Sequence, residues 1–272
     1  MNINKPEFKG ECAFFIENND LCFSSEIKGK LKKIVDNLTE NKVESDKKAV
    51  DFLKKKFNCN NESCLLQKSE IKREIGDDVA KKELERRFKP SGPWDSTQWF
   101  SNFNIDEVLE QFTKKYKSNN FLHIPFQMRD FESIGTELAT VDLSEKYKAG
   151  MGCFGVVLNT DKSTGRGQHW FCIFGDFRKE PFTIEYFNSS GSAPLNEVQI
   201  WMKKTKNRLQ KNLRKPINDI IVSRIRHQTD NHSCGSYSIY YILSRLENIP
   251  KEYFKSNRVC DKLMHKFRSS IF

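Results

Sequence analysis

Apolar residues recur at helical spacing through the first ninety positions. Between residues 25 and 38 they fall on one face, and a shorter pattern of the same kind covers residues 50–57. A third segment, residues 77–89, begins with acidic residues and ends with basic ones. Apolar positions three and four apart are typical of amphipathic helices, and this charge order suits the helix dipole. Three helices are therefore predicted before Pro90 and Pro93, which interrupt regular structure.

The pattern changes after this interruption. A further helix is predicted to begin at Asn104 as its N-cap, with Glu107 three residues later. Three short aromatic and β-branched runs follow and read as neighbouring strands: residues 154–159, 169–174 and 182–187. Next come a basic helix over 201–213, a strand over 220–222 and an apolar helix behind Cys234. We expect an α+β fold with an N-terminal helical domain over residues 1–90 and a second domain over 91–272.

Composition supports a folded chain. Of the 272 residues, 37% are hydrophobic and 22 are Phe, which is enough apolar surface for a core and excludes global disorder. The N-terminus has no apolar signal region and no stretch approaches the roughly 20 apolar residues of a membrane span. We therefore expect a reducing compartment and read the eight Cys as free thiols. A zinc site formed by Cys12, Cys22, Cys59 and Cys64 is disfavoured because Cys-x-x-Cys spacing is absent.

The net charge of +10 is concentrated locally. Residues 201–226 carry nine basic side chains and one acidic residue, Asp219. Such a segment is either a solvated helix face or a docking surface for nucleic acid or an acidic partner, with Lys203, Lys206 and Lys211 as the candidate contacts.

One segment carries a candidate nucleophile. Cys234 lies at the predicted N-terminus of an apolar helix, where backbone N–H groups and the helix dipole are expected to lower the thiol pKa. Gly235 would leave room for a substrate beside it. Taken alone, a Cys behind an apolar helix is more often a buried core residue, so the assignment depends on its partners.

The partners lie at the ends of predicted strands. His169 is the candidate base, and Asn188, after the next strand, could accept the imidazole Nδ1 proton and orient the ring. Gln228, six residues before the nucleophile, could supply an oxyanion-hole amide, and Asn231, three residues before it, is the alternative. We expect Trp170 to pack along one wall of the site.

Two other histidines compete with His169 as the base. His227 and His232 are close to Cys234 in sequence, but the geometry of a turn rarely lets a ring face a sulfur two residues away. His169 therefore remains the preferred base.

The ordered set His169-Trp170, Asn188, Gln228 and Cys234-Gly235 resembles the adenovirus-protease and ubiquitin-like-protein-protease superfamily of cysteine peptidases. Further segments resemble its African-swine-fever-type viral branch: residues 103–107, 158–165, 184–189 and 225–228. The resemblance implies a central mixed β-sheet flanked by helices, an N-terminal arm domain and a Cys-His-Asn triad with a Gln in the oxyanion hole. It also implies no metal or other cofactor.

The same resemblance implies a biological role. We expect cleavage of viral structural polyproteins after Gly-Gly during virion maturation, in the host cytoplasm and the virion. By analogy with adenovirus protease, weak nucleic-acid binding through Lys203, Lys206 and Lys211 is expected. Three alternatives stay open: an isopeptidase for ubiquitin-like proteins, an acetyltransferase, for which Asn188 in place of an acid is atypical, and a basic nucleic-acid-binding or scaffold protein.

Overall fold

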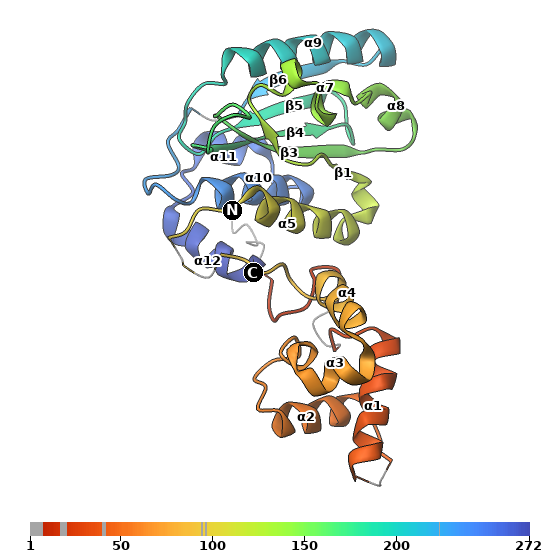
Figure 1. The fold of residues 1–272 in the computed structure, drawn as a ribbon. Coiled ribbons are helices and arrows are strands. Elements are labelled where there is room, and N and C mark those ends of the chain that lie inside the picture. The colour runs from red at the N-terminus through yellow and green to blue at the C-terminus, as the bar shows by residue number, and fades with distance from the viewer. Residues whose placement is uncertain (1–7, 17–20, 40–41, 94, 96, 223) are drawn as a thin grey trace. The chain divides into compact units, whose positions relative to one another are not determined.

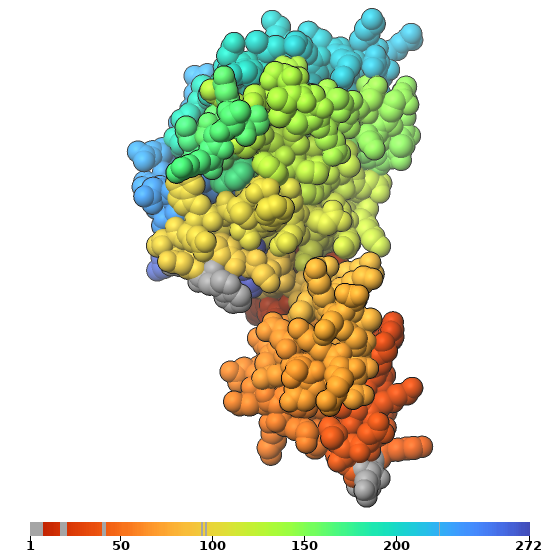
Figure 2. Space-filling view, viewed as in Figure 1, coloured from red at the N-terminus to blue at the C-terminus, as the bar shows by residue number. Residues whose placement is uncertain are grey.

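The structure is a computed structural model that describes residues 8–16, 21–39, 42–93, 95, 97–222 and 224–272. Figure 1 shows the elements, and Figure 2 shows the same view with side chains filled in. The chain divides into two compact units, Phe8–Ser91 and Gly92–Ile271. The division falls one residue beyond the boundary expected between residues 90 and 91.

The N-terminal unit is helical. Its elements are α1 (Ser25–Thr39), α2 (Asp46–Lys56), the 3-10 turn η1 (Leu65–Gln67), α3 (Ser69–Ile75) and α4 (Asp77–Arg87). Leu31, Leu53 and Leu65 are completely buried in its core. Helices α1 and α2 lie where periodicity predicts them, and α4 lies where the order of charges predicts it. Helix α3 was not predicted because seven residues are too few to display a helical period.

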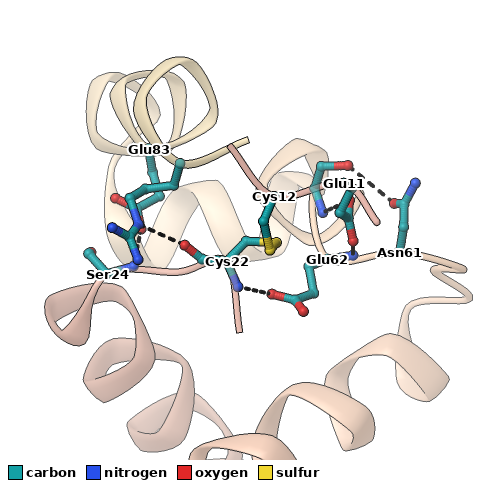
Figure 3. Close-up of a disulfide and its surroundings, with 9 residues drawn as sticks. Glu11, Cys12, Cys22, Ser24, Asn61, Glu62 and Glu83 are labelled. Atoms are coloured by element: carbon teal, nitrogen blue, oxygen red, sulfur yellow. Dashed lines mark hydrogen bonds between the residues drawn. A yellow bond between two sulfur atoms is a disulfide. The ribbon is translucent and has the colours of Figure 1, made fainter. Parts of the chain in front are cut away.

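Two disulfides correct the expectation of eight free thiols. Cys12 pairs with Cys22 and Cys59 pairs with Cys64, with Cα atoms 5.0 and 5.6 Å apart. Carboxylates order the chain around the first pair: Glu62 accepts the backbone N–H of Cys22 at 2.9 Å (Figure 3). The pairing depends on loops that the fold brings together, which Cys spacing does not reveal. It also uses the four sulfurs considered for a zinc site.

The remaining four cysteines are free thiols, as expected: Cys153, Cys172, Cys234 and Cys260. Cys172 is fully buried in the sheet.

The C-terminal unit contains a mixed sheet. Its strands are β1 (Phe121–His123), β2 (Gln127–Met128), β3 (Cys153–Asn159), β4 (Trp170–Asp176), β5 (Phe182–Phe187) and β6 (Ile217–Ile221). The order is β1-β3-β4-β5-β6, with β2 also beside β3. The central pairs β3–β4 and β4–β5 are antiparallel, whereas β1, β2 and β6 join in parallel. The predicted α+β class with a mixed sheet is confirmed.

Helices cover both faces of this sheet, as Figure 1 shows. One face carries α9 (Asn196–Leu213) and the short helices α6 (Phe131–Ile134), α7 (Glu137–Thr140) and α8 (Leu143–Lys148). The other carries α10 (Cys234–Leu246) and α5 (Asn102–Lys115). The unpredicted helices α11 (Lys251–Ser256) and α12 (Asp261–Ile271) follow α10. Strands β3 and β5 are buried along their whole length because helices cover both sides.

The start of α5 differs from the expectation. Ser101, rather than Asn104, is the N-cap: its Oγ accepts the backbone N–H of Asn104 at 3.2 Å, and the Asn104 side chain accepts the N–H of Ser101 at 2.9 Å. This is a capping box in which Asn takes the place of the usual Glu or Gln. Both residue types can cap a helix, so the sequence alone did not distinguish them.

A buried ion pair ties α10 to the sheet. Arg245 Nε lies 2.8 Å from Oε2 of Glu185 on β5, and the Tyr241 hydroxyl donates to the same oxygen at 2.6 Å. Glu185 is completely buried. Removing one partner of such a pair leaves an uncompensated charge, so the contact strongly fixes the helix that begins with Cys234.

Across the described ranges, every helix is too short or too polar to cross a lipid bilayer.

Candidate active site

Cys234 is the first residue of α10, and its side chain is 2% exposed. Burial raises the pKa of its thiol, while the backbone N–H groups of Trp170, Gly235 and Cys234 itself oppose that shift. The N–H groups at the helix N-terminus therefore lower the thiol pKa as expected. Burial raises the pKa by more, because it removes the thiolate from water. The resting thiol therefore keeps its proton to a higher pH than the sequence suggested.

His169 immediately precedes β4. Its carbonyl accepts the backbone N–H of Thr160 at 2.9 Å, and the buried Asn159 side chain accepts the N–H of Gln168 at 2.9 Å. These contacts fix the connection between β3 and β4 from both ends. The backbone N–H of Trp170, the next residue, opposes the rise in the Cys234 pKa.

Asn188 binds the imidazole as predicted, but through the other nitrogen. His169 Nε2 lies 2.7 Å from Asn188 Oδ1. The amide orientation is fixed because Asn188 Nδ2 donates to the Tyr186 hydroxyl at 3.0 Å and Oδ1 also accepts the N–H of Ser190 at 3.0 Å. The expectation of an Nδ1 contact is therefore wrong, since Nδ1 is the nitrogen left for proton exchange elsewhere.

Burial lowers the pKa of His169, and the hydrogen bond to Asn188 partly offsets this. The resting ring is consequently neutral near pH 7. With the proton on Nε2, Nδ1 carries a lone pair that can accept a proton.

Gln228 lies in the site but its amide is already bonded. Its Oε1 accepts the Ser189 hydroxyl at 2.7 Å, and its Nε2 donates to the carbonyl oxygen and Oδ1 of Asp230, both at 3.1 Å. Gln228 can therefore serve an oxyanion only after Nε2 leaves Asp230. Asn231, the alternative, is exposed, and its Oδ1 lies 3.3 Å from Nδ1 of His232.

Gly235 does not border open space. A Cβ atom at this position would lie 2.8 Å from Cδ2 of Phe100, whose carbonyl accepts the Trp170 indole N–H at 3.2 Å. The expected room for substrate is filled by the Phe100 ring, so here the glycine permits close packing. Trp170 is buried and also contacts Phe126 edge to face, in keeping with a wall of the site.

The two competing histidines have other partners. His227 is fully buried and its Nδ1 accepts the backbone N–H of Val259 at 3.1 Å. His232 Nε2 lies 3.5 Å from Asp230 Oδ2. These contacts support His169 as the base.

The candidate docking lysines lie on α9. Lys206 forms an ion pair with Asp219 at 2.7 Å, whereas Lys203 and Lys211 are exposed. The opposing carboxylate reduces the positive field that the sequence suggested.

Sequence reasoning missed the residues that contact Asn188, Gln228 and Gly235. Tyr186 shares a strand face with Asn188 by two-residue periodicity, a signal that could have been used. Ser189 and Phe100 left no such signal, because their roles come from contacts with Gln228 and Gly235 that are distant in sequence.

Known proteins resemble this chain over nearly its whole length. It is 39% identical to cysteine protease S273R of African swine fever virus (isolate Tick/Malawi/Lil 20-1/1983), covering 96% of this chain and 94% of that protein. A putative thiol protease, R355, of Acanthamoeba polyphaga mimivirus is 26% identical over 85% of this chain and 76% of its own length.

Similarity extends to a solved structure. The crystal structure of the African swine fever virus pS273R protease superposes with a TM-score of 0.82 at 35% identity, covering 98% of this chain and 97% of the other. No protein-family model matches. With its free thiol, imidazole and carboxamide on this fold, the chain belongs to the S273R family of viral cysteine proteases.

Proposed function

We propose that this protease cleaves viral structural polyproteins on the carboxyl side of Gly-Gly, using Cys234, His169 and Asn188 as its triad. The observation that carries the proposal is the 2.7 Å contact from Asn188 Oδ1 to His169 Nε2, in a protease whose free thiol Cys234 begins α10. This arrangement leaves Nδ1 of the ring as the proton acceptor for the thiol.

The reaction proceeds through a thioester. Cys234 Sγ attacks the scissile carbonyl carbon as Nδ1 of His169 takes the thiol proton and then gives it to the leaving amine. Water, activated by the same nitrogen, hydrolyses the thioester and releases Cys234. Throughout, Asn188 Oδ1 accepts a hydrogen bond from Nε2–H and stabilises the transient imidazolium.

The oxyanion is held by backbone N–H groups at the start of α10 and by one side-chain amide. Gln228 supplies that amide if substrate binding separates Nε2 from Asp230, and Asn231 supplies it otherwise. Replacing the residue that supplies it by Ala should lower kcat about 10²–10³-fold, whereas replacing the other should have a much smaller effect. Comparing Gln228→Ala with Asn231→Ala in steady-state kinetics assigns the role.

Glycine specificity is supported by the crowding around the sulfur. Cys234 is 2% exposed, and the adjacent Gly235 packs against the Phe100 ring, whose carbonyl accepts the Trp170 indole N–H. A peptide without side chains next to the scissile bond can approach such a thiol with the least displacement of these rings. Peptides ending their acyl side in Gly-Gly should therefore be cut faster than Ala-Gly or Gly-Ala peptides.

The decisive assay uses Gly-Gly-x peptides and candidate capsid precursors, with new termini mapped by mass spectrometry. Cys234→Ala and His169→Ala should each abolish cleavage while the circular dichroism spectrum stays unchanged. Lys203→Ala, on exposed α9 surface, is the control that should retain cleavage. Cleavage by either catalytic variant at the wild-type rate would refute the assignment.

A second candidate activity is removal of ubiquitin-like proteins from conjugates. It is favoured by the name of a relative, SUMO-1 cysteine protease S273R of African swine fever virus (isolate Pig/Kenya/KEN-50/1950), which is 39% identical to this chain. Both activities use the same triad. Measuring kcat/KM on SUMO and ubiquitin conjugates beside the Gly-Gly-x peptides separates the two substrate classes.

Nucleic-acid binding is a further part of the proposal, supported only by the exposed amino groups of Lys203 and Lys211 on α9. Binding should be weak and should fall steeply with salt. Affinity that does not change with salt, or that survives Lys203→Ala/Lys211→Ala, would contradict this role.

We also propose that the protease acts at assembly sites in the host cytoplasm and enters the virion. Immunogold labelling of infected cells and purified particles should locate it in both places. Labelling confined to another compartment would refute this.

A further inference from the structure

Three side chains with metal-binding atoms converge beside the loop that precedes Cys234. Asp230 and His232 belong to this loop, and His265 comes from α12. One ligand atom from each residue lies within 4.8 Å of the other two. None of the three was assigned a role in the peptidase reaction.

Both imidazoles direct the same nitrogen toward one oxygen. His265 Nε2 lies 2.9 Å from Oδ2 of Asp230, and His232 Nε2 lies 3.5 Å from that oxygen. The two rings stack with centroids 5.3 Å apart at an angle of 17°. The Nε2 atoms therefore face a common point at the carboxylate, which is the geometry that a shared cation requires.

The other nitrogen of His232 strengthens this interpretation. Its Nδ1 lies 3.3 Å from Asn231 Oδ1, an acceptor that favours a hydrogen on Nδ1. In the tautomer with its hydrogen on Nδ1, His232 presents the lone pair of Nε2 toward Oδ2 of Asp230. Two electron-rich atoms facing each other are stabilised when a cation lies between them, and a metal-ligating histidine typically donates its other N–H in this way.

The second carboxylate oxygen is used elsewhere. Asp230 Oδ1 accepts the backbone N–H groups of His232 and Ser233 at 3.2 and 3.0 Å. These bonds hold the carboxylate in place while Oδ2 faces the imidazoles. The Ser233 hydroxyl also donates to Oδ2, at 2.5 Å, and would share that oxygen with an ion.

We propose that Asp230, His232 and His265 bind a divalent transition-metal ion of the zinc class. Two imidazole nitrogens and one carboxylate oxygen suit such an ion, and water completes a tetrahedral shell. On binding, the Nε2 hydrogen of His265 moves to Nδ1 or to solvent, because a ligating nitrogen must present its lone pair. The ion would link α12 to the loop that leads into Cys234.

The exposure of the three side chains suits reversible binding. The His265 side chain is 46% exposed, so an ion can reach the site from solvent, whereas Asp230 and His232 are mostly buried. The site is separate from the proposed triad, whose His169 bonds to Asn188.

The test uses the full chain with Cys234→Ala, which removes the catalytic thiol as a competing metal ligand. Titration with zinc chloride in a calorimeter should show one ion bound per chain and a higher Tm in its presence. Adding His265→Ala should weaken binding about 100-fold or more and remove the Tm increase, because one of three protein ligands is lost. His265 is exposed, so this replacement does not disturb the core.

Matched variants exclude the other candidate ligands. Cys234→Ala combined with either His169→Ala or Cys260→Ser should bind zinc as tightly as Cys234→Ala alone. Cobalt(II) bound to Cys234→Ala should show a visible spectrum of nitrogen and oxygen ligation, without a thiolate charge-transfer band. Loss of binding in the Cys260→Ser or His169→Ala background, a thiolate band, or undiminished binding after His265→Ala would each overturn the proposal.

Discussion

Nε2 of His169 lies 2.7 Å from Oδ1 of Asn188, and this contact leaves Nδ1 available to the nucleophile. The orientation of the Asn188 amide is fixed, because its Nδ2 donates to the Tyr186 hydroxyl at 3.0 Å. Tyr186 on β5, Asn188 just after β5 and His169 just before β4 therefore form a chain of contacts that determines which imidazole nitrogen faces Asn188.

Replacing Asn188 by Ala should lower kcat/KM about 10²-fold or more, since the imidazole loses the acceptor that orients it. Asn188→Asp should retain more activity, because a carboxylate accepts the same proton, and should raise the pKa of His169 by adding a negative charge. Peptide cleavage measured across pH checks both effects. Equal activity in Asn188→Ala and the wild type would contradict an orienting role.

Tyr186 positions Asn188 without touching the imidazole. Tyr186→Phe removes the hydroxyl that accepts Nδ2 and should cost about 1 kcal/mol in the free energy of unfolding. It should lower kcat several-fold while KM changes little, because the replacement disturbs the orientation of the His169 imidazole and not substrate binding. Peptide kinetics and urea unfolding measure the two effects, and an altered KM with normal kcat would contradict the explanation.

The reactivity of Cys234 should depend on pH as a protonated resting thiol does. Burial raises the pKa of this thiol and lowers the pKa of His169, so both shifts disfavour a thiolate–imidazolium pair. Alkylation by iodoacetamide should therefore accelerate with rising pH through the neutral range. The measurement uses Cys260→Ser, which removes the exposed free thiol, and mass spectrometry of the labelled peptide. A rate that stays constant down to about pH 5 would indicate a preformed ion pair instead.

His227 should make the folded protein sensitive to acid. Burial lowers its pKa to about 4, whereas an imidazole in the unfolded chain titrates near 6.5. Between these values the unfolded chain binds a proton that the folded chain does not. The free energy of unfolding should therefore decrease as the pH falls from about 6.5 to about 4, by up to about 3 kcal/mol.

Urea unfolding of the wild type and His227→Gln at several pH values measures this contribution. The variant should lose less stability over the acid range. His123→Gln is the opposite control. Burial lowers the pKa of His123, but its interactions with Asp106 and Glu110 raise that pKa overall. His123 therefore stabilises the fold at acidic pH, and this contribution is lost as the pH rises. A pH profile that is identical in His227→Gln and the wild type would exclude His227 as the source.

Gly235→Ala should destabilise the C-terminal unit by about 1–3 kcal/mol, because the new Cβ would strike the Phe100 ring. Two contacts restrain Phe100. The Trp170 indole N–H donates to its carbonyl, and the Arg268 guanidinium lies 4.8 Å from its ring centroid. Activity should fall as well, since the displaced ring adjoins the site. Calorimetric unfolding and peptide kinetics provide the measurements.

Gly29→Ala is the matched control. Gly29 lies inside α1, and an added Cβ there has no heavy atom within 4 Å. This replacement should stabilise the N-terminal unit by about 1 kcal/mol, because alanine favours a helix. A similar loss of stability in both variants would show that steric contact with Phe100 is not the cause.

The sequence by itself determined several of the elements and indicated the candidate residues for the chemistry. Helical periodicity located α1 and α2, the order of charges located α4, and short aromatic and β-branched runs located β3, β4 and β5, because these signals are local. The order of His169, Asn188 and Cys234 was enough to indicate thiol peptidase chemistry.

Only the tertiary structure decided how those residues act. It selected Nε2 as the contact to Asn188, bonded Gln228 to Asp230, placed Phe100 against Gly235 and paired four cysteines. It also reversed the expected shift of the Cys234 pKa, because burial depends on everything packed around the sulfur. Each of these features arises from atoms far apart along the chain, and local sequence patterns contain no information about such distances.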